Sequence, residues 1–458
     1  MGKKFDYEYI VIGSGPAGSA AAFMAAEAGV KTAIVEADKW GGTNLNYRDV
    51  PAKTALSFSH SYARAIENAK TGLSSANLRY NYPTAVNWQN TVIRKAGGNS
   101  KKDFEEAGIT CLHGYAQFVS PTEITVGSQT IRGGRFLLAT GAHLDTNGIS
   151  GIEKVQCLTP DQAYSLNRLP RAVMVVGGGS TGCEIAQYYA ELGVKVLIAE
   201  IAGRLLPHED EEVGQVMDQF FNKKLGIKVL TESRVIGVEQ DAVSKRVVFL
   251  RDGQEKAVRV DAIVLATGSR PNLDLGLDKA GIKVDRYGLV VDRTLQTSAR
   301  HIWAAGDILG GDSSTEKAAY EGALAAANLL NRSRNSVNHT GFVRVTDTFP
   351  QIATVGVTED DCLKRDHKFK KVVVSLSTVM VSNIEDFKGG FVKLLADRQG
   401  KILGATVMAP NADLIIQEIA LAMRHDLTVV EIASTPHVAS SWSDIIKVAA
   451  RKLAKTIK

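Results

Sequence analysis

The strongest constraint on the fold is a pattern that occurs twice in the chain. It reads YEYIVIGSGPAGSAAAFMAAEAGVKTAIVE from residue 7 and RAVMVVGGGSTGCEIAQYYAELGVKVLIAE from residue 171. Each copy has an apolar strand, a G-x-G-x-x-G turn, a helical segment and a second strand that ends in an acid. That acid stands 23 residues after the first glycine in both copies, at 13 to 36 and at 177 to 200. Two copies with this context predict two dinucleotide-binding βαβ units.

Each glycine of the turn has a separate physical role. The first allows the tight turn, the second lets the backbone approach a pyrophosphate, and the third lets the helix pack on the strand. The helix N-terminus attracts phosphate through its N–H groups and dipole, and the acid accepts hydrogen bonds from a ribose. The weaker alternative to two nucleotide-binding sites is that both glycine-rich turns are purely structural turns of a doubly wound sheet. The positions are Gly13, Gly15, Gly18 and Glu36, and then Gly177, Gly179, Gly182 and Glu200.

Three more strand ends complete the pattern. FLLATGAHL (136–144) and AIVLATGSRPN (262–272) each follow one βαβ unit, and HIWAAGDILGG (301–311) ends a strand in Gly-Asp. We expect the first two to close their nucleotide-binding regions and the Asp307 carboxylate to reach a cofactor hydroxyl. From about His339 the pattern changes to strands followed by helices, which predicts a separate α+β domain.

Composition limits the class of protein. The 458 residues predict several domains. The net charge of +5, without a basic run interleaved with aromatics, argues against nucleic-acid binding. Four scattered cysteines lack metal-ligand spacing and, with no apolar leader or membrane span, predict a soluble cytoplasmic protein without a metal site. The basic amphipathic segment at 443–458 gives only weak support for membrane contact.

Taken together, the glycine turns, the ATG strand ends, the AAGD segment and the PQIATVGVTE run resemble the pyridine nucleotide-disulfide oxidoreductases over nearly the whole chain. The resemblance implies an α/β fold with two Rossmann-like domains, for FAD and NAD, and a C-terminal α+β dimerisation domain. The expected boundaries are 1–148 for the FAD-binding domain, 149–270 for the NAD(H)-binding domain, 271–338 for a central segment closing the FAD site and 339–458 for the dimerisation domain. It also implies a homodimer.

Cofactor contacts follow from the resemblance position by position. FAD is expected on Gly13, Ser14, Gly15, Gly18, Glu36, Thr43, Lys53, Ala116, Thr140, Gly141, Asp307 and Thr315. The nicotinamide cofactor is expected on Gly177, Gly179, Thr181, Glu184, Glu200 and Gly268. Relatives that use NADPH usually carry arginines where this chain has Glu200 and Leu206. A carboxylate repels a 2′-phosphate, so NADH is favoured over NADPH, although Arg204 lies nearby and partly offsets this argument.

Two residues carry the expected transfer from NADH to flavin. In the family the lysine matching Lys53 lies beside flavin N5 and pairs with the carboxylate matching Glu184, so that the positive charge favours electron density at N5. The alternative is an ordinary exposed ion pair. Both are assigned as catalytic.

The chain lacks the residues that carry out the second half of the family's reaction, the reduction of a disulfide. The family pattern GGTCLNxGCIPSK reads GGTNLNYRDVPAK at 41–53, so Asn44 and Asp49 replace the two redox cysteines. Neither an amide nor a carboxylate can form or break a disulfide. Ala439 stands where the family's HPTxSE motif has its catalytic histidine, and we expect nearby His437 to be structural or exposed, with a functional role as the weaker alternative.

Electrons are therefore expected to leave the flavin for a small non-disulfide acceptor, such as a quinone, free flavin or oxygen. Asn44 and Asp49 are assigned to the acceptor face as catalytic residues. Asp49 is either a buried carboxylate near the ring or is neutralised by Arg48, while Tyr47 and Trp442 either stack on the acceptor or pack at the dimer interface. The alternative functions are an NAD(P) transhydrogenase and a flavin-loaded scaffold or NADH sensor.

Overall fold

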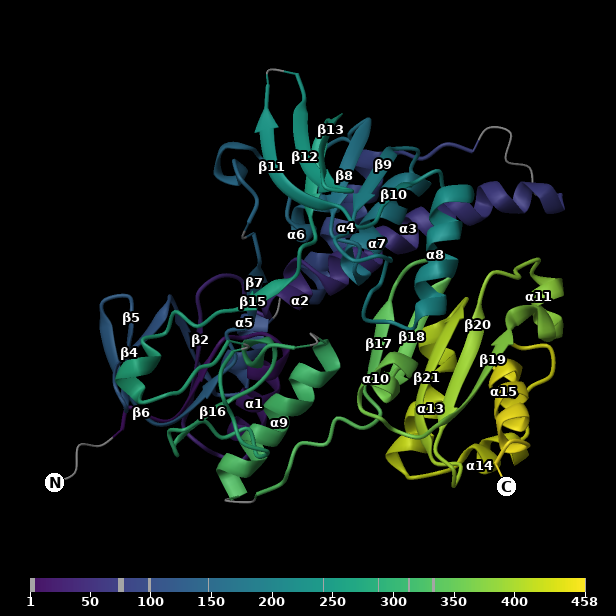
Figure 1. Cartoon of the computed structure of the whole chain (residues 1–458). Helices are drawn as coiled ribbons and strands as arrows, with labels where there is room; N and C mark the ends of the chain where they lie inside the picture. The colour runs from purple at the N-terminus through teal and green to yellow at the C-terminus, as the bar shows by residue number, and fades with distance from the viewer. Residues whose placement is uncertain are drawn as a thin grey trace. The chain divides into compact units, whose positions relative to one another are not determined.

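The computed structural model of the chain describes residues 5–72, 78–97, 100–146, 148–241, 243–286, 288–311, 314–331 and 334–457. The chain forms two compact units, each assembled from three segments (Figure 1). The first unit contains 1–54, 84–145 and 267–339, and the second contains 55–83, 146–266 and 340–458. The predicted four-part domain division is finer than these two units and stays a prediction.

A largely parallel sheet lies at the centre of the first unit. Strands β3, β2, β1 and β6 are parallel neighbours, β16 pairs with β6, and β6 continues into an antiparallel extension with β5 and β4. The second half of β1 is fully buried, as expected for an apolar strand covered on both faces. The bounds are β1 (Tyr7–Ile12), β2 (Thr32–Glu36), β3 (Thr110–His113), β4 (Ala116–Ser120), β5 (Glu123–Val126), β6 (Gln129–Leu138) and β16 (Ile302–Ala304).

Two alanine-rich helices pack closely on this sheet. A Cβ placed on Gly322 in α9 would lie 2.0 Å from the carbonyl oxygen of Ala17 in α1, so the two helix backbones are nearly in contact. Their small side chains share a core with Tyr9 and Val11 of β1. The β7–β15 pair and further helices belong to the same part of the chain, except that α3 continues into the second unit from residue 55 and α4 enters the first unit at residue 84. The bounds are α1 (Pro16–Glu27), α2 (Gly42–Asn46), α3 (Asp49–Glu67), α4 (Tyr82–Gly97), α5 (Ser100–Glu106), α9 (Thr315–Asn331), β7 (Ala142–Leu144) and β15 (Ser269–Pro271).

The second unit repeats the βαβ arrangement in a smaller sheet. Its four parallel strands follow the order β10, β9, β8, β14, and β11, β12 and β13 form an antiparallel sheet. Four of the five residues of β8 are buried, and α7 follows the strand directly after the second glycine turn. The bounds are α6 (Pro160–Ala163), β8 (Ala172–Val176), α7 (Ser180–Glu191), β9 (Lys195–Ala199), α8 (Glu211–Lys223), β10 (Lys228–Leu230), β11 (Arg234–Gln240), β12 (Lys245–Arg251), β13 (Gln254–Val260) and β14 (Ala262–Leu265).

The C-terminal part of the second unit has the predicted α+β fold, which is confirmed, while its predicted boundary stays a prediction. Its five antiparallel strands follow the order β17, β18, β21, β20, β19. The apolar face of the basic helix α15 is buried in this domain's core, so that face is not available to a membrane. The bounds are β17 (Val343–Thr346), β18 (Gln351–Gly356), α10 (Glu359–Lys364), β19 (Lys370–Ser375), α11 (Met380–Ile384), β20 (Phe391–Ala396), β21 (Ile402–Ala409), α12 (Ala412–Ile415), α13 (Gln417–Arg424), α14 (Val429–Ser434) and α15 (Asp444–Ala454).

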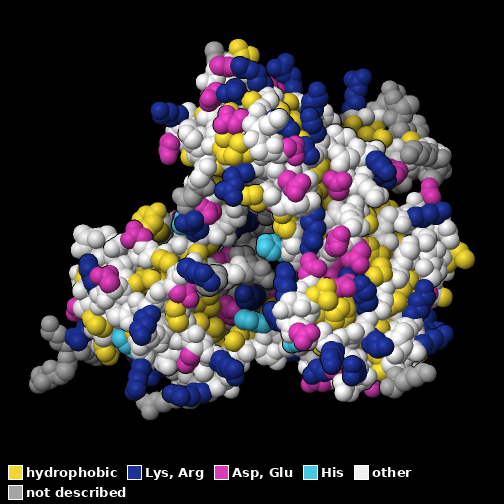
Figure 2. Space-filling model, viewed as in Figure 1, with side chains coloured by type: hydrophobic (Ala, Val, Ile, Leu, Met, Phe, Trp, Pro, Cys, Tyr) yellow, Lys and Arg dark blue, Asp and Glu magenta, His cyan; other side chains and the backbone are white. Residues whose placement is uncertain are grey.

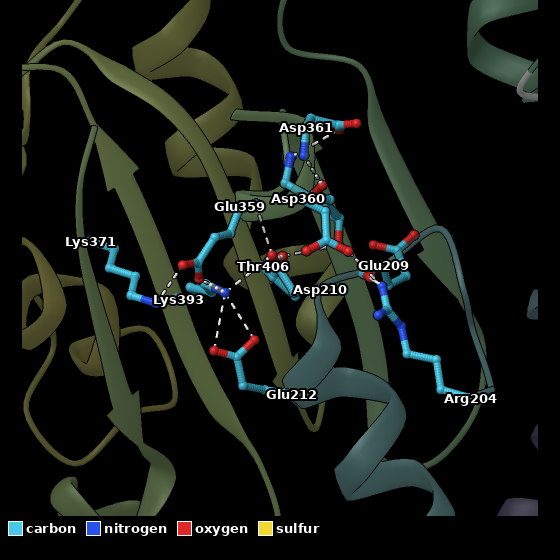
Figure 3. A network of polar contacts seen from close by, with 12 residues as sticks. Arg204, Glu209, Asp210, Glu212, Glu359, Asp360, Asp361, Lys371, Lys393 and Thr406 are labelled. Atoms are coloured by element: carbon cyan, nitrogen blue, oxygen red, sulfur yellow. Dashed lines mark hydrogen bonds and ion pairs between the residues drawn. The ribbon is translucent and has the colours of Figure 1, made fainter. Parts of the chain in front are cut away.

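A buried lysine joins α8, α10 and β20 inside the second unit (Figure 3). The Lys393 side chain is 1% exposed, and its Nζ lies 3.1 Å from Asp210, 2.9 Å from Glu212 and 2.6 Å from Glu359. Burial lowers the pKa of Lys393, but the hydrogen bonds that its ammonium donates to these carboxylates outweigh that effect and raise its pKa. The ammonium therefore stays charged among the carboxylates, and we name this group the Lys393 cluster.

The surface mixes charges of both signs. On the face viewed in Figure 2, Lys and Arg side chains are interspersed with Asp and Glu rather than gathered into one large patch. Among the described residues, no helix has the length and apolar character needed to cross a membrane.

Candidate cofactor sites and the altered redox motif

The first glycine turn leaves an open helix N-terminus. Gly13 has φ of +104°, and the N-cap residue of α1 is Gly15, which has no side chain to bond to the first N–H groups. A Cβ added to Gly15 would meet nothing within 4 Å, whereas one added to Gly18 would lie 1.8 Å from the carbonyl oxygen of Gly13. There is space at the second glycine and close packing at the third, as a dinucleotide pyrophosphate requires.

Glu36 lies beside this turn at the end of β2. Its Oε2 accepts hydrogen bonds from the backbone N of Ser14 at 2.9 Å and from the Ser14 hydroxyl at 2.6 Å, and its Oε1 accepts the N–H of Asp38 at 2.9 Å. The backbone N of Gly114 donates to the carbonyl of Glu36, which brings the segment leading to Ala116 to the same place. The acid is thus held where the sequence places a ribose contact.

Other predicted FAD residues converge on the same turn from distant segments. A Cβ on Gly42, next to Thr43, would lie 2.6 Å from Cα of Gly15. A Cβ on Gly306, next to Asp307, would lie 3.3 Å from Cβ of Ala17 in α1. The structure therefore brings the segments that carry Thr43 and Asp307 to the N-terminal end of α1, and this end fits a dinucleotide such as FAD.

Two groups that the sequence analysis missed fix the surrounding strand ends. Asn272 donates through Nδ2 to the carbonyl of Thr140 at 2.7 Å and through its backbone N to the carbonyl of Gly141 at 2.9 Å. Glu321, which is 1% exposed, accepts the N–H of Gly306 at 2.9 Å. Asn272 lies in the AIVLATGSRPN segment, so the sequence pattern could have identified it. Glu321 lies within α9, where no motif indicates its role.

The altered motif forms α2 and the start of α3. Asn44 lies in α2, where its Oδ1 accepts a hydrogen bond from the hydroxyl of Thr315 at 2.8 Å. Asp49 begins α3, and its Oδ1 lies 3.9 Å from Nζ of Lys53 one turn later. These two side chains are 36% and 50% exposed. Asp49 is therefore a partly exposed carboxylate beside a lysine, not a deeply buried one.

The second glycine turn has the same geometry as the first. Gly177 has φ of +110°, a Cβ on Gly179 would meet nothing within 4 Å, and one on Gly182 would lie 1.9 Å from the carbonyl oxygen of Gly177. The N-cap residue of α7 is Gly179, which has no side chain to bond to the first N–H groups, and Thr181 in the first turn is exposed. This turn fits a second dinucleotide.

Glu200 closes the second unit's βαβ element. Its Oε2 accepts the N–H of Gly178 at 2.6 Å and its Oε1 accepts the N–H of Ala202 at 2.7 Å. The residue is 6% exposed. Gly268, with φ of +97°, follows β14 and belongs by its contacts to the first unit.

One face of α7 holds the loop between β17 and β18. The hydroxyl of Thr346 donates to Ser180 at 2.8 Å, the N–H of Asp347 donates to Oε1 of Glu184 at 2.7 Å, and the N–H of Phe349 donates to Gln187 at 3.0 Å. These contacts fix the Glu184 carboxylate. Its expected pairing with Lys53 joins the two units and stays a prediction.

A histidine of α3 supports the same loop. His60 Nδ1 lies 2.7 Å from Oε2 of Glu191, and Nε2 lies 3.0 Å from the carbonyl oxygen of Asp347. Burial lowers the pKa of His60, but the hydrogen bond to Glu191 and its charge outweigh burial and raise it. This contact between α3, α7 and the loop had no sequence signal.

The cysteines cannot substitute for the missing redox pair. All four are free, and Cys183 and Cys362 are fully buried. Burial raises the pKa of each thiol, to about 11 for Cys111, so all remain protonated near neutral pH. A protonated thiol is a poor nucleophile.

The C-terminal residues near Ala439 are structural. The side chain of His437 is 4% exposed, with Nε2 2.9 Å from Oε2 of Glu418. Trp442 is buried against Phe387, with ring centroids 6.2 Å apart, and donates to Glu385 at 3.2 Å. Trp442 thus packs within its own domain and is not available to stack on an acceptor.

Known proteins match the chain over nearly its whole length. Residues 7–323 match the pyridine nucleotide-disulphide oxidoreductase family, and residues 343–450 match its dimerisation domain, which supports a homodimer. Relatives include a mercuric reductase from Bacillus cereus, 32% identical over 94% of this chain and 69% of its own length. A dihydrolipoyl dehydrogenase from Geobacillus stearothermophilus is 30% identical over 97% and 95%.

Solved structures agree in fold. LpdA from Mycobacterium tuberculosis superposes with a TM-score of 0.87 at 28% identity, covering 97% of this chain and 99% of its own. The flavoprotein disulfide reductase RclA from Escherichia coli gives a TM-score of 0.86 at 23% identity, covering 97% and 99%. The two dinucleotide turns, the C-terminal domain and these matches lead to one assignment. The chain belongs to the pyridine nucleotide-disulphide oxidoreductase family.

Proposed function

We propose that this protein is an FAD-dependent NADH oxidoreductase that passes electrons from the flavin directly to a small non-disulfide acceptor, with a quinone as the leading candidate. One observation carries the proposal. The nucleotide turns expected for both cofactors are intact, while Asn44, Asp49 and Ala439 occupy the positions of the family's thiols and base. Membership of the family makes the protein an FAD-dependent pyridine nucleotide oxidoreductase. The identity of the electron acceptor is what we propose.

The residues of the donor half support transfer from a nicotinamide. FAD, when bound, accepts two electrons and releases them singly or in pairs. In this proposal Lys53 supplies positive charge at the ring, and the N–H of Asp347 holds the Glu184 carboxylate in a fixed position. NADH is the favoured donor, because the Glu200 carboxylate is fixed by two N–H groups and repels a 2′-phosphate.

The acceptor half supports neither disulfide nor thiolate-metal chemistry. Soft metal ions such as mercury bind to thiolates, and the four cysteines of this chain are protonated and scattered. The Nδ2 of Asn44 can instead donate a hydrogen bond to an oxygen of a quinone or a similar planar molecule, and the Asp49 carboxylate can accept one from a hydroxyl of the quinol that forms. The residues at the altered motif thus favour direct transfer.

Stopped-flow spectroscopy under anaerobic conditions tests both halves. NADH should bleach the visible flavin absorbance, and a benzoquinone added afterwards should restore it. A Lys53→Gln variant that still binds FAD should be reduced more slowly. Unchanged flavin absorbance with NADH, or turnover of lipoamide or glutathione disulfide at rates typical of disulfide reductases, would contradict the proposal.

The same experiment separates the alternative functions. A transhydrogenase requires NADPH to reduce the flavin at millimolar concentration. A scaffold or sensor would bind FAD tightly and respond to NADH, but would reduce a panel of quinones, flavins, oxygen and Cu(II) no faster than free flavin does.

A further inference from the structure

The loop after β9, residues 200–210, returns to the second glycine turn. The N–H of Leu206 donates to the carbonyl of Gly178 at 2.8 Å, and Leu206 adopts φ of +51°. A Cβ on Gly178 would lie 2.7 Å from Cδ2 of Leu205 and 3.0 Å from Oε2 of Glu200. The loop therefore passes beside the group that meets the adenosine ribose of the proposed NADH.

Arg204 is the arginine of this loop, but its guanidinium is engaged elsewhere. Its Nη2 lies 2.7 Å from Oδ2 of Asp360 and donates to the carbonyls of Glu209 at 3.1 Å and Pro207 at 3.3 Å. The aliphatic part of the side chain lies against Gly214 in α8. The charge that could attract a 2′-phosphate is thus neutralised by a carboxylate from the C-terminal domain.

The position of Asp360 is itself fixed by the Lys393 cluster (Figure 3). The N–H of Glu359, the neighbour of Asp360, donates to Oδ1 of Asp210 at 2.9 Å, and Oδ2 of Asp210 accepts the Thr406 hydroxyl at 2.8 Å. Asp210 directly precedes α8 and is 2% exposed. The start of α10 is therefore held against the start of α8, with Asp360 directed at Arg204.

We propose that Asp360 is a positioning residue for cofactor specificity, which holds Arg204 away from the site of a 2′-phosphate and so disfavours NADPH. This inference rests on the proposed use of NADH at the second glycine turn. Glu200 repels the phosphate directly, and Asp360 removes the cation that would offset that repulsion. Specificity then depends on two domains of the second unit, not on the loop alone.

Ligand binding to the FAD-loaded protein tests the inference without turnover. Adenosine 2′,5′-bisphosphate and ADP are compared by calorimetry, because the first carries the 2′-phosphate and the second does not. The isosteric Asp360→Asn variant should bind the bisphosphate about fivefold more tightly, the gain expected from one partly exposed ion pair, with ADP binding unchanged.

Two further variants identify the cause. In Arg204→Gln/Asp360→Asn the gain should disappear, because Arg204 supplies the released charge. Asp426→Asn removes a carboxylate from the exposed ion pair with Lys401 and should change neither affinity. Equal effects on both ligands, no gain in Asp360→Asn, or a gain that persists without Arg204 would each overturn the inference. A protein that shows the selective gain but fails to reduce its flavin upholds this inference and contradicts the proposed function.

Discussion

Asn44 and Thr315 lie 271 positions apart, and the Thr315 hydroxyl donates a 2.8 Å hydrogen bond to Oδ1 of Asn44. The bond fixes the orientation of an amide where the family has a redox cysteine. α2 and the start of α9 are thus joined at the predicted acceptor face. This contact gives Asn44 a structural partner that a thiol at the same position would use less well, because sulfur is a weak acceptor.

The amide should matter for electron exit and not for electron entry. Asn44→Ala should slow reoxidation of the reduced flavin by a quinone by about tenfold, the effect of roughly 1.4 kcal/mol, while reduction by NADH is unchanged. Stopped-flow absorbance measures both steps. Thr315→Val keeps the amide but removes its partner, and should give a smaller effect of the same sign. Slower reduction with normal reoxidation would contradict this role.

Asp49 should tune the flavin through Lys53, which lies 3.9 Å away. Removing the negative charge in Asp49→Asn leaves more of the lysine's positive field at the ring, so the flavin should become easier to reduce. A spectroelectrochemical titration should show a midpoint potential more positive by about 30 mV, equal to roughly 1.4 kcal/mol for two electrons. Lys53→Gln should shift the potential in the opposite direction. An unchanged potential in both variants would place the pair away from the flavin.

Substitution of Gly15 should weaken FAD binding, whereas substitution of Gly18 should destabilise the fold. A Cβ on Gly15 meets nothing within 4 Å, so Gly15→Ala should fold normally but lose FAD affinity by at least about tenfold. A Cβ on Gly18 would lie 1.8 Å from a backbone oxygen, so Gly18→Ala should cost at least about 3 kcal/mol, the upper end for overpacking. Circular dichroism and bound-flavin content distinguish the two variants. A folded Gly15→Ala protein with full FAD content would show that the pyrophosphate does not lie there.

Lys393 should be far more important for stability than Lys371, although both pair with Glu359. Lys393→Met leaves three carboxylates with an unbalanced charge inside the protein and should lower the free energy of unfolding by about 3–5 kcal/mol. Lys371 is 46% exposed, and Lys371→Met should cost less than about 1 kcal/mol. Urea denaturation followed by fluorescence measures both. Similar small losses in the two variants would contradict the buried cluster.

The raised pKa of His60 should make the free energy of unfolding depend on pH. Its pKa is raised in the folded protein, so its contribution is fully present below about pH 6.5, the unfolded value, and is lost as pH rises through the folded pKa. The urea midpoint of the wild type should therefore fall between pH 6 and pH 8.5 by more than that of His60→Gln. His425→Gln, at an exposed position, should behave like the wild type. Identical pH profiles for His60→Gln and wild type would contradict the assignment.

The sequence alone determined the features that depend on local backbone chemistry. The roles of Gly13, Gly15 and Gly18 follow from conformation and contact within one turn, and the structure shows the expected open and crowded positions. The C-terminal α+β domain was predicted from its strand pattern for the same reason. The replacement of both redox cysteines could likewise be read directly, because side-chain identity decides whether disulfide exchange can occur.

Tertiary structure decided everything that depends on which distant side chains meet. Arg204 meets Asp360 across 156 positions, and His60 meets Glu191 across 131. Neither pair has a spacing or periodicity that a sequence reveals. Burial also decided that Trp442 is a core residue, that His437 pairs with Glu418, and that the face of α15 is covered. Such contacts arise when separate elements pack and exclude water, so charge and hydrogen-bond partners are fixed only in the folded chain.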